Sequence, residues 1–393
     1  MDSNLCIIRW HKYISLNANS FIFALLMSIH ESYMKRCLQL AELALGQVAP
    51  NPLVGALLVY EGRIIGEGYH RHFGGPHAEI DCLHAVAEEN RKFISRSTMY
   101  VSLEPCVHYG KTPPCVDRII KEEIPRVVIG CRDPFPQVNG RGIEKLRSAG
   151  IEVEMGLMER DSRELNRRFF TFHTKHRPYI ILKWAQTADG RIANEDYSRL
   201  QVSNEFSNRL VHRWRSEESS ILVGTNTALF DDPALTTRLW PGKNPIRLVV
   251  DMNLRLPSSL QLFSGEYPTI IFNQYKNSIE DFSRYMQPWE KMNAGHPVLY
   301  YQVSKDTNLV HQILNALYHL KIQTVLVEGG ALLLQSFIDE NSWDEARIIT
   351  NQDLKAGQGI KAPRGIQEGL VKEMKLSSDL IQIYRAGEPE SNN

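Results

Sequence analysis

One histidine and two cysteines connect two parts of this chain that are far apart in sequence. Residues 76–79 read PHAE, and residues 104–115 read EPCVHYGKTPPC. His77, Cys106 and Cys115 offer one imidazole and two thiolates, a ligand set that binds Zn²⁺ and leaves its fourth position for water. A catalytic zinc needs that open position. The pattern therefore predicts one Zn²⁺ per chain, with ligands from the start of a helix and from a segment that comes after a strand.

Glu79 follows the histidine by two residues, at the start of the same predicted helix. Zinc lowers the pKa of its bound water towards 7, and a carboxylate here can carry the water's proton to the departing amine. Because H-x-E followed by P-C pairs is typical of zinc deaminases, we predict Glu79 to be catalytic. For His77 alone, a plain helix start is the alternative, since proline and acidic residues suit a first turn. The residues that this helix is expected to bury are Ile80, Leu83, His84 and Val86.

The cysteine count and the charge balance exclude other classes of protein. Six cysteines in 393 residues are too few for a disulfide scaffold, which indicates the cytoplasm. Cys37, Cys82 and Cys131 belong to no ligand pattern, so we expect them in the core. The 45 Lys and Arg balance the 45 Asp and Glu, with no basic run, which argues against a nucleic-acid partner. A small molecule is the expected substrate.

The N-terminal segment differs in character from the rest of the chain. Residues 21–29, FIFALLMSI, are apolar, but a membrane span needs roughly 20 such residues. No small-residue cleavage site comes after them, so we expect neither a signal peptide nor a membrane partner. We predict residues 1–26 to be an extension or a start-site artefact, with translation beginning at Met27.

Strand-like and helix-like segments alternate in two series, which predicts two α/β domains. The first series begins with an amphipathic helix over 27–46, followed by a hairpin that turns at Glu61. A charged helix over 161–173 closes the first series. The two series differ in strand spacing, so they are two domains rather than a duplication, with bounds of 27–172 and 173–393.

The second half places glycine and polar residues at the ends of apolar strands. Its three such segments are LKWAQTADGRIA, ILVGTNTALFDDPALTTR and LVEGGALLLQSF. In open α/β sheets, ligands bind at the carboxyl ends of strands. Gly329 and Gly330 open a predicted helix over 331–339, whose first N–H groups suit a phosphate, although a plain strand-to-helix turn is an open alternative. No G-x-G-x-x-G comes after the first strand, so this half is not an obvious Rossmann domain.

These segments together resemble the bifunctional riboflavin-biosynthesis deaminase/reductases. That family's motif is close to EPC-x-H-x-G-[RK]-TPPC, and residues 104–115 match it almost throughout, including an insertion that cytidine and tRNA adenosine deaminases lack. APNPLVGA, EGYH and RDPFPQVNGRG are also similar, as are the three segments of the second half. The resemblance implies a cytidine-deaminase-like three-layer α/β domain, the zinc deaminase of 27–172. It also implies a dihydrofolate-reductase-like α/β domain, the NADPH-dependent reductase of 173–393.

The reaction that the resemblance implies has two steps. The first is hydrolytic deamination of 2,5-diamino-6-ribosylamino-4(3H)-pyrimidinone 5′-phosphate, and the second is NADPH reduction of its ribosyl side chain to ribityl. We also expect a homo-oligomer that forms through the reductase domain. Two alternatives stay open. One is a nucleic-acid base deaminase, which would need a basic face and stacking aromatics. The other is a pyrimidine deaminase whose C-terminal domain only binds or assembles.

The resemblance also implies the binding residues of each half. Those of the deaminase pocket are Asn51, His70, Lys111 and Asp133. Those near NADPH are Ala185, Thr227, Asp231, Gly330, Ala331, Leu332, Leu333, Leu334, Gln335 and Ser336. Those near the reductase substrate are Lys183, Arg215, Leu235, Arg238 and Glu328. The chain departs from the family at Gln201, where many relatives carry a W-I-T-S-like segment with an aromatic near the cofactor.

Overall fold

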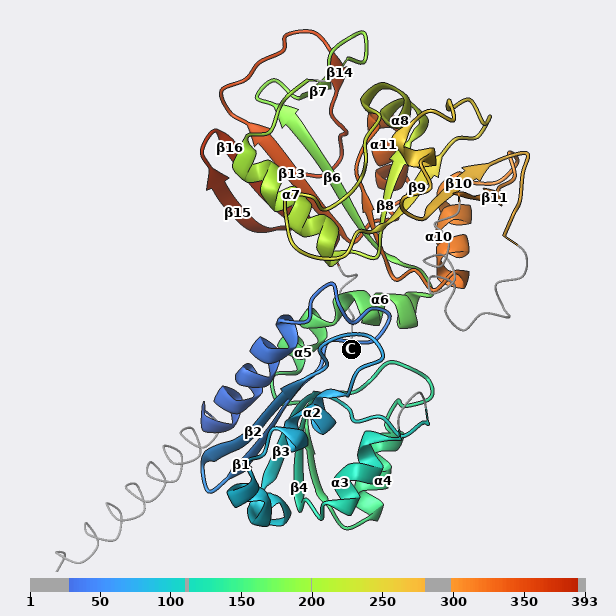
Figure 1. The fold of residues 1–393 in the computed structure, drawn as a ribbon. Coiled ribbons are helices and arrows are strands. Elements are labelled where there is room, and N and C mark those ends of the chain that lie inside the picture. The colour runs from blue at the N-terminus through green and yellow to red at the C-terminus, as the bar shows by residue number, and fades with distance from the viewer. Residues whose placement is uncertain (1–27, 110–112, 199, 280–297, 388–393) are drawn as a thin grey trace, which may run out of the picture. The chain divides into compact units, whose positions relative to one another are not determined.

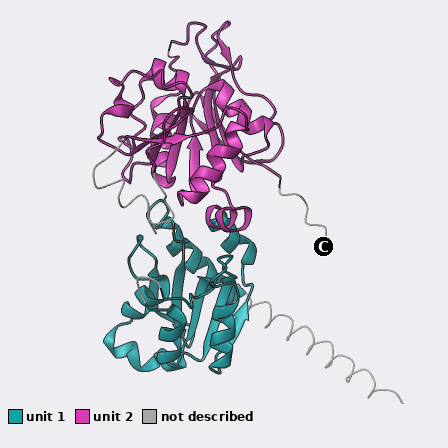
Figure 2. Ribbon diagram, turned by 90° about the vertical axis from the view of Figure 1, so that its right-hand side faces the viewer, with its two compact units in different colours: residues 1–167 teal, residues 168–393 magenta. Residues whose placement is uncertain are grey.

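The computed structural model describes residues 28–109, 113–198, 200–279 and 298–387. The chain divides into two compact units between Arg167 and Arg168 (Figure 2). The boundary expected at 172–173 falls inside helix α6 (Arg167–Lys175) and stays a prediction. The segment 1–26 lies outside the described residues. Within the described ranges, no helix combines the length and the apolar character that crossing a membrane would require.

The first unit contains a five-stranded sheet in the order β2-β1-β3-β4-β5 (Figure 1). The strands are β1 (Gly55–Tyr60), β2 (Arg63–Tyr69), β3 (Thr98–Leu103), β4 (Arg126–Cys131) and β5 (Glu152–Met155). β1 pairs antiparallel with both β2 and β3, whereas β3, β4 and β5 run parallel. The β1–β2 turn lies at Glu61 and Gly62, as predicted, and both residues adopt a positive φ.

Helices cover both faces of this sheet and make three layers. They are a helix over 28–42, α2 (Ala78–His84), α3 (Cys115–Lys121), α4 (Arg141–Ser148) and α5 (Glu159–Leu165), and a 3₁₀ segment, η1 (Glu88–Arg96), precedes β3. Alternate residues of β1 point to opposite faces. Leu58 packs in a core with α2, α3 and α4, whereas Leu57 packs in a second core with Met34 of the first helix. Cys37, Cys82 and Cys131 are buried, as predicted.

Two predictions about these helices were wrong. His84 is exposed, because α2 ends there and its last turn presents the ring to solvent. The single charged helix expected over 161–173 is two helices, α5 and α6, which meet at Asn166. The side chain of Asn166 is buried and pairs with the backbone of Leu53, accepting from its N–H and donating to its carbonyl at 2.8 Å each. This exchange fixes the chain at the break.

The second unit contains a nine-stranded sheet in the order β11-β10-β9-β8-β12-β6-β13-β16-β15. The strands are β6 (Tyr179–Thr187), β8 (Ser220–Gly224), β9 (Ile246–Val250), β10 (Thr269–Asn273), β11 (Val298–Gln302), β12 (Thr324–Val327), β13 (Glu345–Asn351), β15 (Leu370–Leu376) and β16 (Asp379–Arg385). All neighbours from β11 to β13 are parallel, whereas β16 and β15 add antiparallel at the edge. β7 (Arg191–Ala193) and β14 (Ile360–Lys361) form a separate short ribbon.

Helices also lie on both faces of the second sheet. They are α7 (Glu205–Glu217), α8 (Thr225–Asp231), α10 (Leu309–His319) and α11 (Ala331–Asp339), and a short 3₁₀ segment, η2 (Gln261–Phe263), comes after β9. Leu317 of α10 and Phe337 of α11 pack against one face, whereas Trp214 of α7 packs against the other. Because β6, β8 and β12 are parallel neighbours, the loops at their carboxyl ends emerge at one edge of the sheet.

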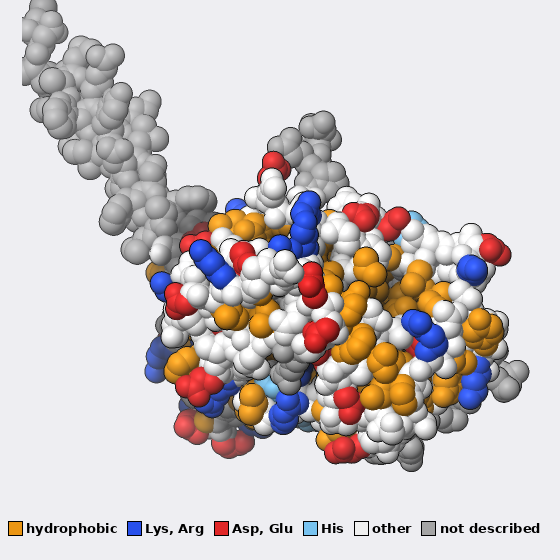
Figure 3. All heavy atoms as spheres, turned by 90° about the horizontal axis from the view of Figure 1, so that it is seen from above, with side chains coloured by type: hydrophobic (Ala, Val, Ile, Leu, Met, Phe, Trp, Pro, Cys, Tyr) orange, Lys and Arg blue, Asp and Glu red, His pale blue; other side chains and the backbone are white. Residues whose placement is uncertain are grey.

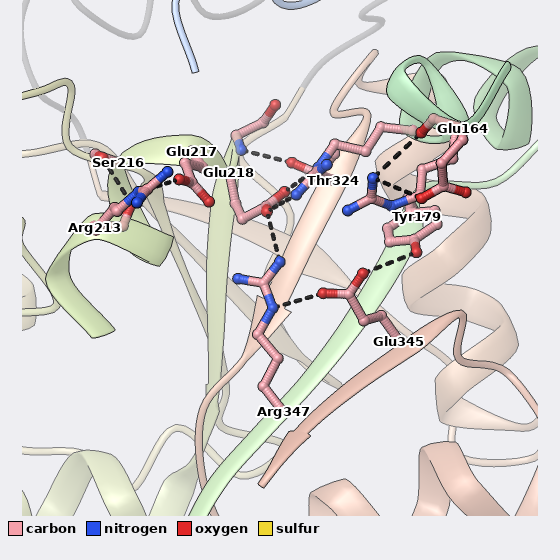
Figure 4. Close-up of polar contacts among 12 residues, drawn as sticks. Glu164, Tyr179, Arg213, Ser216, Glu217, Glu218, Thr324, Glu345 and Arg347 are labelled. Carbon is pink, nitrogen blue, oxygen red and sulfur yellow. Dashed lines mark hydrogen bonds and ion pairs between the residues drawn. The ribbon is translucent and has the colours of Figure 1, made fainter. Parts of the chain in front are cut away.

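A buried ionic network joins strand starts at the opposite edge (Figure 4). Glu218 precedes β8 and binds Arg168 of α6 and Arg347 of β13. Arg347 donates to Glu345 at 2.6 Å, and Tyr179 donates its hydroxyl proton to Glu345 at 3.3 Å. Two arginines and two glutamates balance in charge, as buried ions must. The network lies away from the edge where ligands are expected.

Candidate functional site

The predicted zinc ligands converge in the first unit. His77 Nδ1 lies 3.5 Å from Cys106 Sγ and 3.3 Å from Cys115 Sγ, and all three ligand atoms lie within 4.8 Å of one another. A tetrahedral zinc with bonds near 2.3 Å to sulfur and 2.1 Å to nitrogen separates its ligand atoms by roughly 3.5–3.8 Å. The three side chains therefore fit a Zn²⁺ ion.

Local structure brings these ligands together. His77 is the N-cap of α2, and Cys115 is the first residue of α3. Cys106 lies just beyond β3, and its carbonyl and Sγ accept the N–H groups of Val116 at 3.2 Å and Cys115 at 3.4 Å. These two bonds connect Cys115 and Val116 to Cys106, which keeps the two sulfur atoms close together.

The two thiols differ in their readiness to ionise. Hydrogen bonds from the Cys115 thiol and from His77 lower the pKa of the Cys106 thiol to about 4. The same contact raises the pKa of the Cys115 thiol, because its ionisation would place a second negative charge beside the first. A cation between the sulfur atoms relieves that repulsion, and a coordinating thiol is deprotonated outright.

Glu79 is the second residue of α2 and is 3% exposed. Burial raises the pKa of its carboxyl group, and the nearby Cys106 raises it further. A carboxyl group with a raised pKa binds and releases a proton nearer neutral pH than a solvated one does. The geometry therefore suits the proton-carrier role expected for this residue.

Asn51 and His70 lie beside the metal ligands. His70 is buried, and its ring lies edge-on to the ring of His77 with centroids 5.3 Å apart. Its Nδ1 lies 2.8 Å from the Pro76 carbonyl, which can only accept, so Nδ1 carries the proton. Nε2 then accepts from the amide of Asn51 at 3.0 Å. Burial lowers the pKa of His70, which favours the neutral form of the ring.

Of the other two residues expected in this pocket, the structure describes Asp133 but not Lys111. Asp133 lies just beyond β4 and is buried, and burial raises its pKa to about 7. Its carboxylate accepts the N–H of Phe135 at 2.7 Å, which fixes the loop. Its charge interacts with that of Cys106. Lys111 lies outside the described residues.

A second constellation lies at the ligand edge of the second unit. Arg215 of α7 makes a two-pronged pair with Glu328, the residue after β12, with N–O distances of 2.8 and 2.7 Å. Lys183 of β6 approaches the same carboxylate to 3.7 Å. Burial alone would raise the pKa of Glu328, but Arg215 and Lys183 outweigh it and hold the pKa at about 2.

The remaining expected substrate residues differ in exposure. Arg238 is exposed, whereas Leu235 is buried in a core with residues of α8, β8 and β9. The third donor group of Arg215, Nη1, donates to the Thr236 carbonyl at 3.2 Å. Arg215 is therefore fully engaged within the protein, and Arg238 is the more available cation.

Most of the expected cofactor residues belong to the first turns of α8 and α11. Gly329 has a φ of +135°, and a Cβ atom there would lie 2.9 Å from Thr227 Cγ2, so the close approach of the two loops requires glycine. Gly330 is the N-cap of α11, with a φ of +78°. Leu333 and Leu334 are buried in the core, and the Leu334 N–H donates to the Gly330 carbonyl at 3.0 Å.

The other expected cofactor residues differ in their exposure and in their hydrogen bonds. Leu332 is 84% exposed, and Asp231 is exposed at the end of α8. Ala185 on β6 is half-buried. Gln335 donates to Asp339 at 2.8 Å, and the Ser336 hydroxyl donates to the Leu333 carbonyl at 2.8 Å. No side chain caps the start of α11 at Gly330 and Ala331 among the described residues.

Three features were not predicted from the sequence. Glu104, directly before the Pro-Cys pair, is buried and accepts four backbone N–H groups. His212, one turn before Arg215, is buried, and its Nδ1 has no hydrogen-bond partner among the described residues. Tyr197 stacks on Phe230 of α8, with ring centroids 5.3 Å apart. For Glu104, its place in the EPC motif was an available indication.

The charge on one face of the molecule is mixed. Figure 3 shows acidic and basic side chains interspersed with hydrophobic patches on the face that it presents. On the described part of that face, the basic side chains do not merge into one patch. A nucleic-acid deaminase would need a basic surface to neutralise phosphates.

Two family models match the chain, one in each half. The model described as "Cytidine and deoxycytidylate deaminase zinc-binding region" matches residues 27–131. The model described as "RibD C-terminal domain" matches residues 178–357. The first match contains His77, Cys106 and Cys115, and the second contains Lys183, Arg215 and Glu328.

Similar proteins span both halves. The riboflavin biosynthesis protein RibD of Aquifex aeolicus is 40% identical over 372 residues, which cover 92% of this chain and 99% of that protein. Its counterpart in Synechocystis is 42% identical over 355 residues, covering 90% and 92%. A solved structure of a diaminohydroxyphosphoribosylaminopyrimidine deaminase/5-amino-6-(5-phosphoribosylamino)uracil reductase from Thermotoga maritima is 35% identical, with a TM-score of 0.78 over 91% of this chain and 99% of that one. Acinetobacter baumannii RibD is 28% identical, with a TM-score of 0.80 over 92% and 100%.

Proposed function

This chain belongs to the family of bifunctional riboflavin-biosynthesis deaminase/reductases, and on that premise we propose which of its residues carry the two reactions. Its first unit is a cytidine-deaminase-like three-layer domain, and its second is a dihydrofolate-reductase-like α/β domain. The enzyme is a zinc-dependent deaminase and an NADPH-dependent reductase. The alternative in which the second domain only binds or assembles is not favoured, because that domain matches the family's reductase model.

The substrate that we propose is 2,5-diamino-6-ribosylamino-4(3H)-pyrimidinone 5′-phosphate. The Thermotoga maritima relative is described by deamination and reduction of such phosphoribosyl pyrimidines. Deamination replaces the amino group of the ring by oxygen from water and releases ammonia. Reduction then converts the ribosyl side chain to ribityl. The convergence of His77, Cys106 and Cys115 beside buried Glu79 is the observation that carries the first step.

In the deamination, His77, Cys106 and Cys115 would hold Zn²⁺, which would supply a water of lowered pKa. Glu79 would accept a proton from the attacking water and pass it to the amino group, so that the water oxygen bonds to the ring carbon, the C–N bond breaks and ammonia leaves. The raised pKa of Glu79 supports this role, because the carboxyl group must hold the proton between the two transfers.

Substrate binding in the first unit falls to Asn51, His70, Asp133 and Lys111. His70 and Asn51 form a neutral, preoriented pair, which suits hydrogen bonding to a pyrimidine edge. Asp133 has a pKa near neutrality and can therefore donate or accept a hydrogen bond. Lys111 is assigned to the phosphate by family resemblance alone.

In the reduction, NADPH supplies the hydride, and the protein positions both partners. We assign the phosphates of NADPH to the start of α11, where Gly330 to Ser336 come after the tight contact between Gly329 and Thr227. Ala185 of β6 and Asp231 of α8 are further candidates for cofactor binding.

For the reductase substrate, Arg238 is the phosphate anchor that we favour, since Arg215 is held by Glu328. An exposed guanidinium can grip a phosphate with two parallel hydrogen bonds. We assign Lys183, Glu328 and Leu235 to the sugar of this substrate, since Lys183 and Glu328 lie together at the ligand edge.

The catalytic assignment is tested by replacing Glu79 with glutamine. We expect Glu79→Gln to bind zinc as the unchanged enzyme does and to lose ammonia release by about 10²- to 10⁴-fold, the usual contribution of a positioned proton carrier. Zinc content and ammonia release are measured on the same preparation. Glu88→Gln is the matched control, because Glu88 is exposed in the same unit. Ammonia release at the unchanged rate would remove Glu79 from the mechanism.

The assembly and the location of the enzyme are further parts of the proposal. We infer a cytoplasmic homo-oligomer that forms through the reductase domain, within bounds of 173–393. The exposed edge strand β15 supports this, since Leu370 and Val371 are both exposed and an unpaired edge can pair with a second copy. Sedimentation of the full chain checks the inference, and a monomer at micromolar concentration would contradict it.

A further inference from the structure

Glu104 occupies an unusual position for a carboxylate. It comes directly after β3, two residues before the zinc ligand Cys106, and it is 3% exposed. Within the described ranges, no lysine or arginine forms an ion pair with it, and its charge is met by backbone N–H groups. A buried carboxylate is costly unless hydrogen bonds satisfy its oxygens. The four bonds that it accepts therefore hold it strongly in place.

These four bonds come from two other segments. Oε2 accepts from Gly140 at 2.9 Å and from Asp133 at 3.3 Å. Oε1 accepts from Gly142 at 2.9 Å and from Ile143 at 3.3 Å. Gly140 is the N-cap of α4, and Gly142 and Ile143 lie in its first turn. The carboxylate therefore satisfies N–H groups at a positive helix end while also holding the Asp133 loop.

The contact with α4 is also close in space. A Cβ atom on Gly142 would lie 2.4 Å from the Pro105 carbonyl oxygen and 3.0 Å from Oε1 of Glu104. Only glycine lets the helix start approach the segment that leads into Cys106. Pro105 and Glu104 are thus held on both sides, by packing and by hydrogen bonds.

We propose that Glu104 is a positioning residue for deamination: it sets Cys106 and Asp133 in one arrangement, so that a zinc ligand and a substrate-binding group keep a fixed separation. The inference rests on the proposed function of this site. Among the described residues, the carboxylate of Glu104 bonds to backbone N–H groups and not to the zinc ligand atoms. It acts through the backbone of the two segments that it joins, and each of them carries one functional side chain.

Glu104→Gln separates this role from simple packing. Glutamine keeps the size and shape of the side chain, but it replaces one acceptor oxygen by an NH₂ group that faces backbone N–H donors. We expect zinc affinity to fall by about 10- to 100-fold, the range seen when groups that support metal ligands are removed. We also expect the KM for the diaminopyrimidine substrate to rise. If Glu104 only fills space, glutamine leaves both unchanged.

The measurement uses the full chain. Zinc affinity is read by competition with a chromogenic chelator, and the Co²⁺-substituted protein reports ligand geometry through its thiolate absorption. Reduction of the already deaminated substrate by NADPH is the internal control for folding of the second unit. Glu144→Gln is the matched control, because Glu144 lies exposed on the same helix, α4, and it should match the unchanged enzyme in every readout.

Each outcome decides the proposal. Weakened zinc binding with an altered Co²⁺ spectrum supports it, and unchanged zinc binding and KM overturn it. If Glu104→Gln fails to fold, Glu104→Asp keeps the charge with a shorter reach. We then expect partial zinc binding, whereas unchanged affinity overturns the proposal. Failure of the unchanged enzyme to release ammonia would count against the proposed function alone. Zinc affinity and the Co²⁺ spectrum are measured without substrate, so they still test the role of Glu104.

Discussion

At the scale of single residues, burial and neighbouring charges shift the pKa values of ionisable groups in both sites. In the first unit, burial raises the pKa values of Glu79 and Asp133. In the second, Arg215 and Lys183 reverse that effect at Glu328. Groups with such shifts collect at functional sites, because chemistry near neutral pH needs them.

The Glu328 cluster makes a prediction for stability. Glu328→Gln leaves Arg215 and Lys183 buried without their carboxylate, and we expect the second unit to lose about 3–5 kcal/mol, the usual cost of breaking a buried ion pair. Urea unfolding followed by fluorescence measures the change. Glu205→Gln is the control, since Glu205 is exposed in the first turn of α7, where a charge contributes under about 1 kcal/mol.

The carboxyl group of Glu328 also predicts how the free energy of unfolding depends on pH. The pKa of Glu328 is about 2 in the folded protein and 4.5 in its ordinary state. A lowered pKa contributes stability that is fully present above pH 4.5 and is lost as the pH falls towards 2. The difference in unfolding free energy between the unchanged enzyme and Glu328→Gln should therefore shrink in that window. A difference that stays constant down to pH 2 would contradict the assignment.

At the scale of elements, the start of α11 depends on the Gly329–Gly330 turn. Gly329→Ala would bring a Cβ atom to 2.9 Å from Thr227 at a φ that side chains rarely adopt. We expect NADPH to bind at least tenfold more weakly, as read by quenching of protein fluorescence, while ammonia release stays unchanged. Gly190→Ala is the control for positive-φ strain, because that glycine has a φ of +73° with no neighbour within 4 Å. Equal effects of the two changes would show that strain, not the contact, matters.

Much of the fold could be predicted from sequence because most buried strands carry continuous apolar runs. β8, β9 and β10 are examples, with almost every residue buried. β15 was not predicted, because its residues are mostly exposed and alternate weakly. The strands β7 and β14 have only three and two residues, too few for any periodicity. A strand that is stabilised only by hydrogen bonds to its neighbour, without a buried apolar face, leaves no hydrophobic pattern in the sequence.

The candidate site divides in the same way. The zinc ligands and Glu79 could be predicted, because metal chemistry demands particular residue types at particular spacing. The EPC motif indicates Glu104 as a candidate, but its role depends on N–H groups of Asp133 and α4 that the sequence does not place beside it. The pairing of Arg215 with Glu328 was also unforeseen, because these residues come from α7 and from the end of β12.

At the scale of the whole molecule, the chain carries two chemistries in two compact units with separate cores. Each unit contains its own site, built from residues of that unit. The reactions are nevertheless linked in order, because the reductase acts on the product of deamination. A chain of this kind should therefore consume NADPH only after ammonia has been released.

The most direct test follows NADPH oxidation optically after the diaminopyrimidine ribosyl phosphate is added to the zinc-loaded enzyme. We predict oxidation that requires this substrate, ceases when zinc is removed by a chelator, and is lost in Glu79→Gln. Supplying the deaminated pyrimidine should restore oxidation in both cases. Ammonia release without NADPH oxidation would contradict the account, because it would mean that the second unit does not reduce the product of the first.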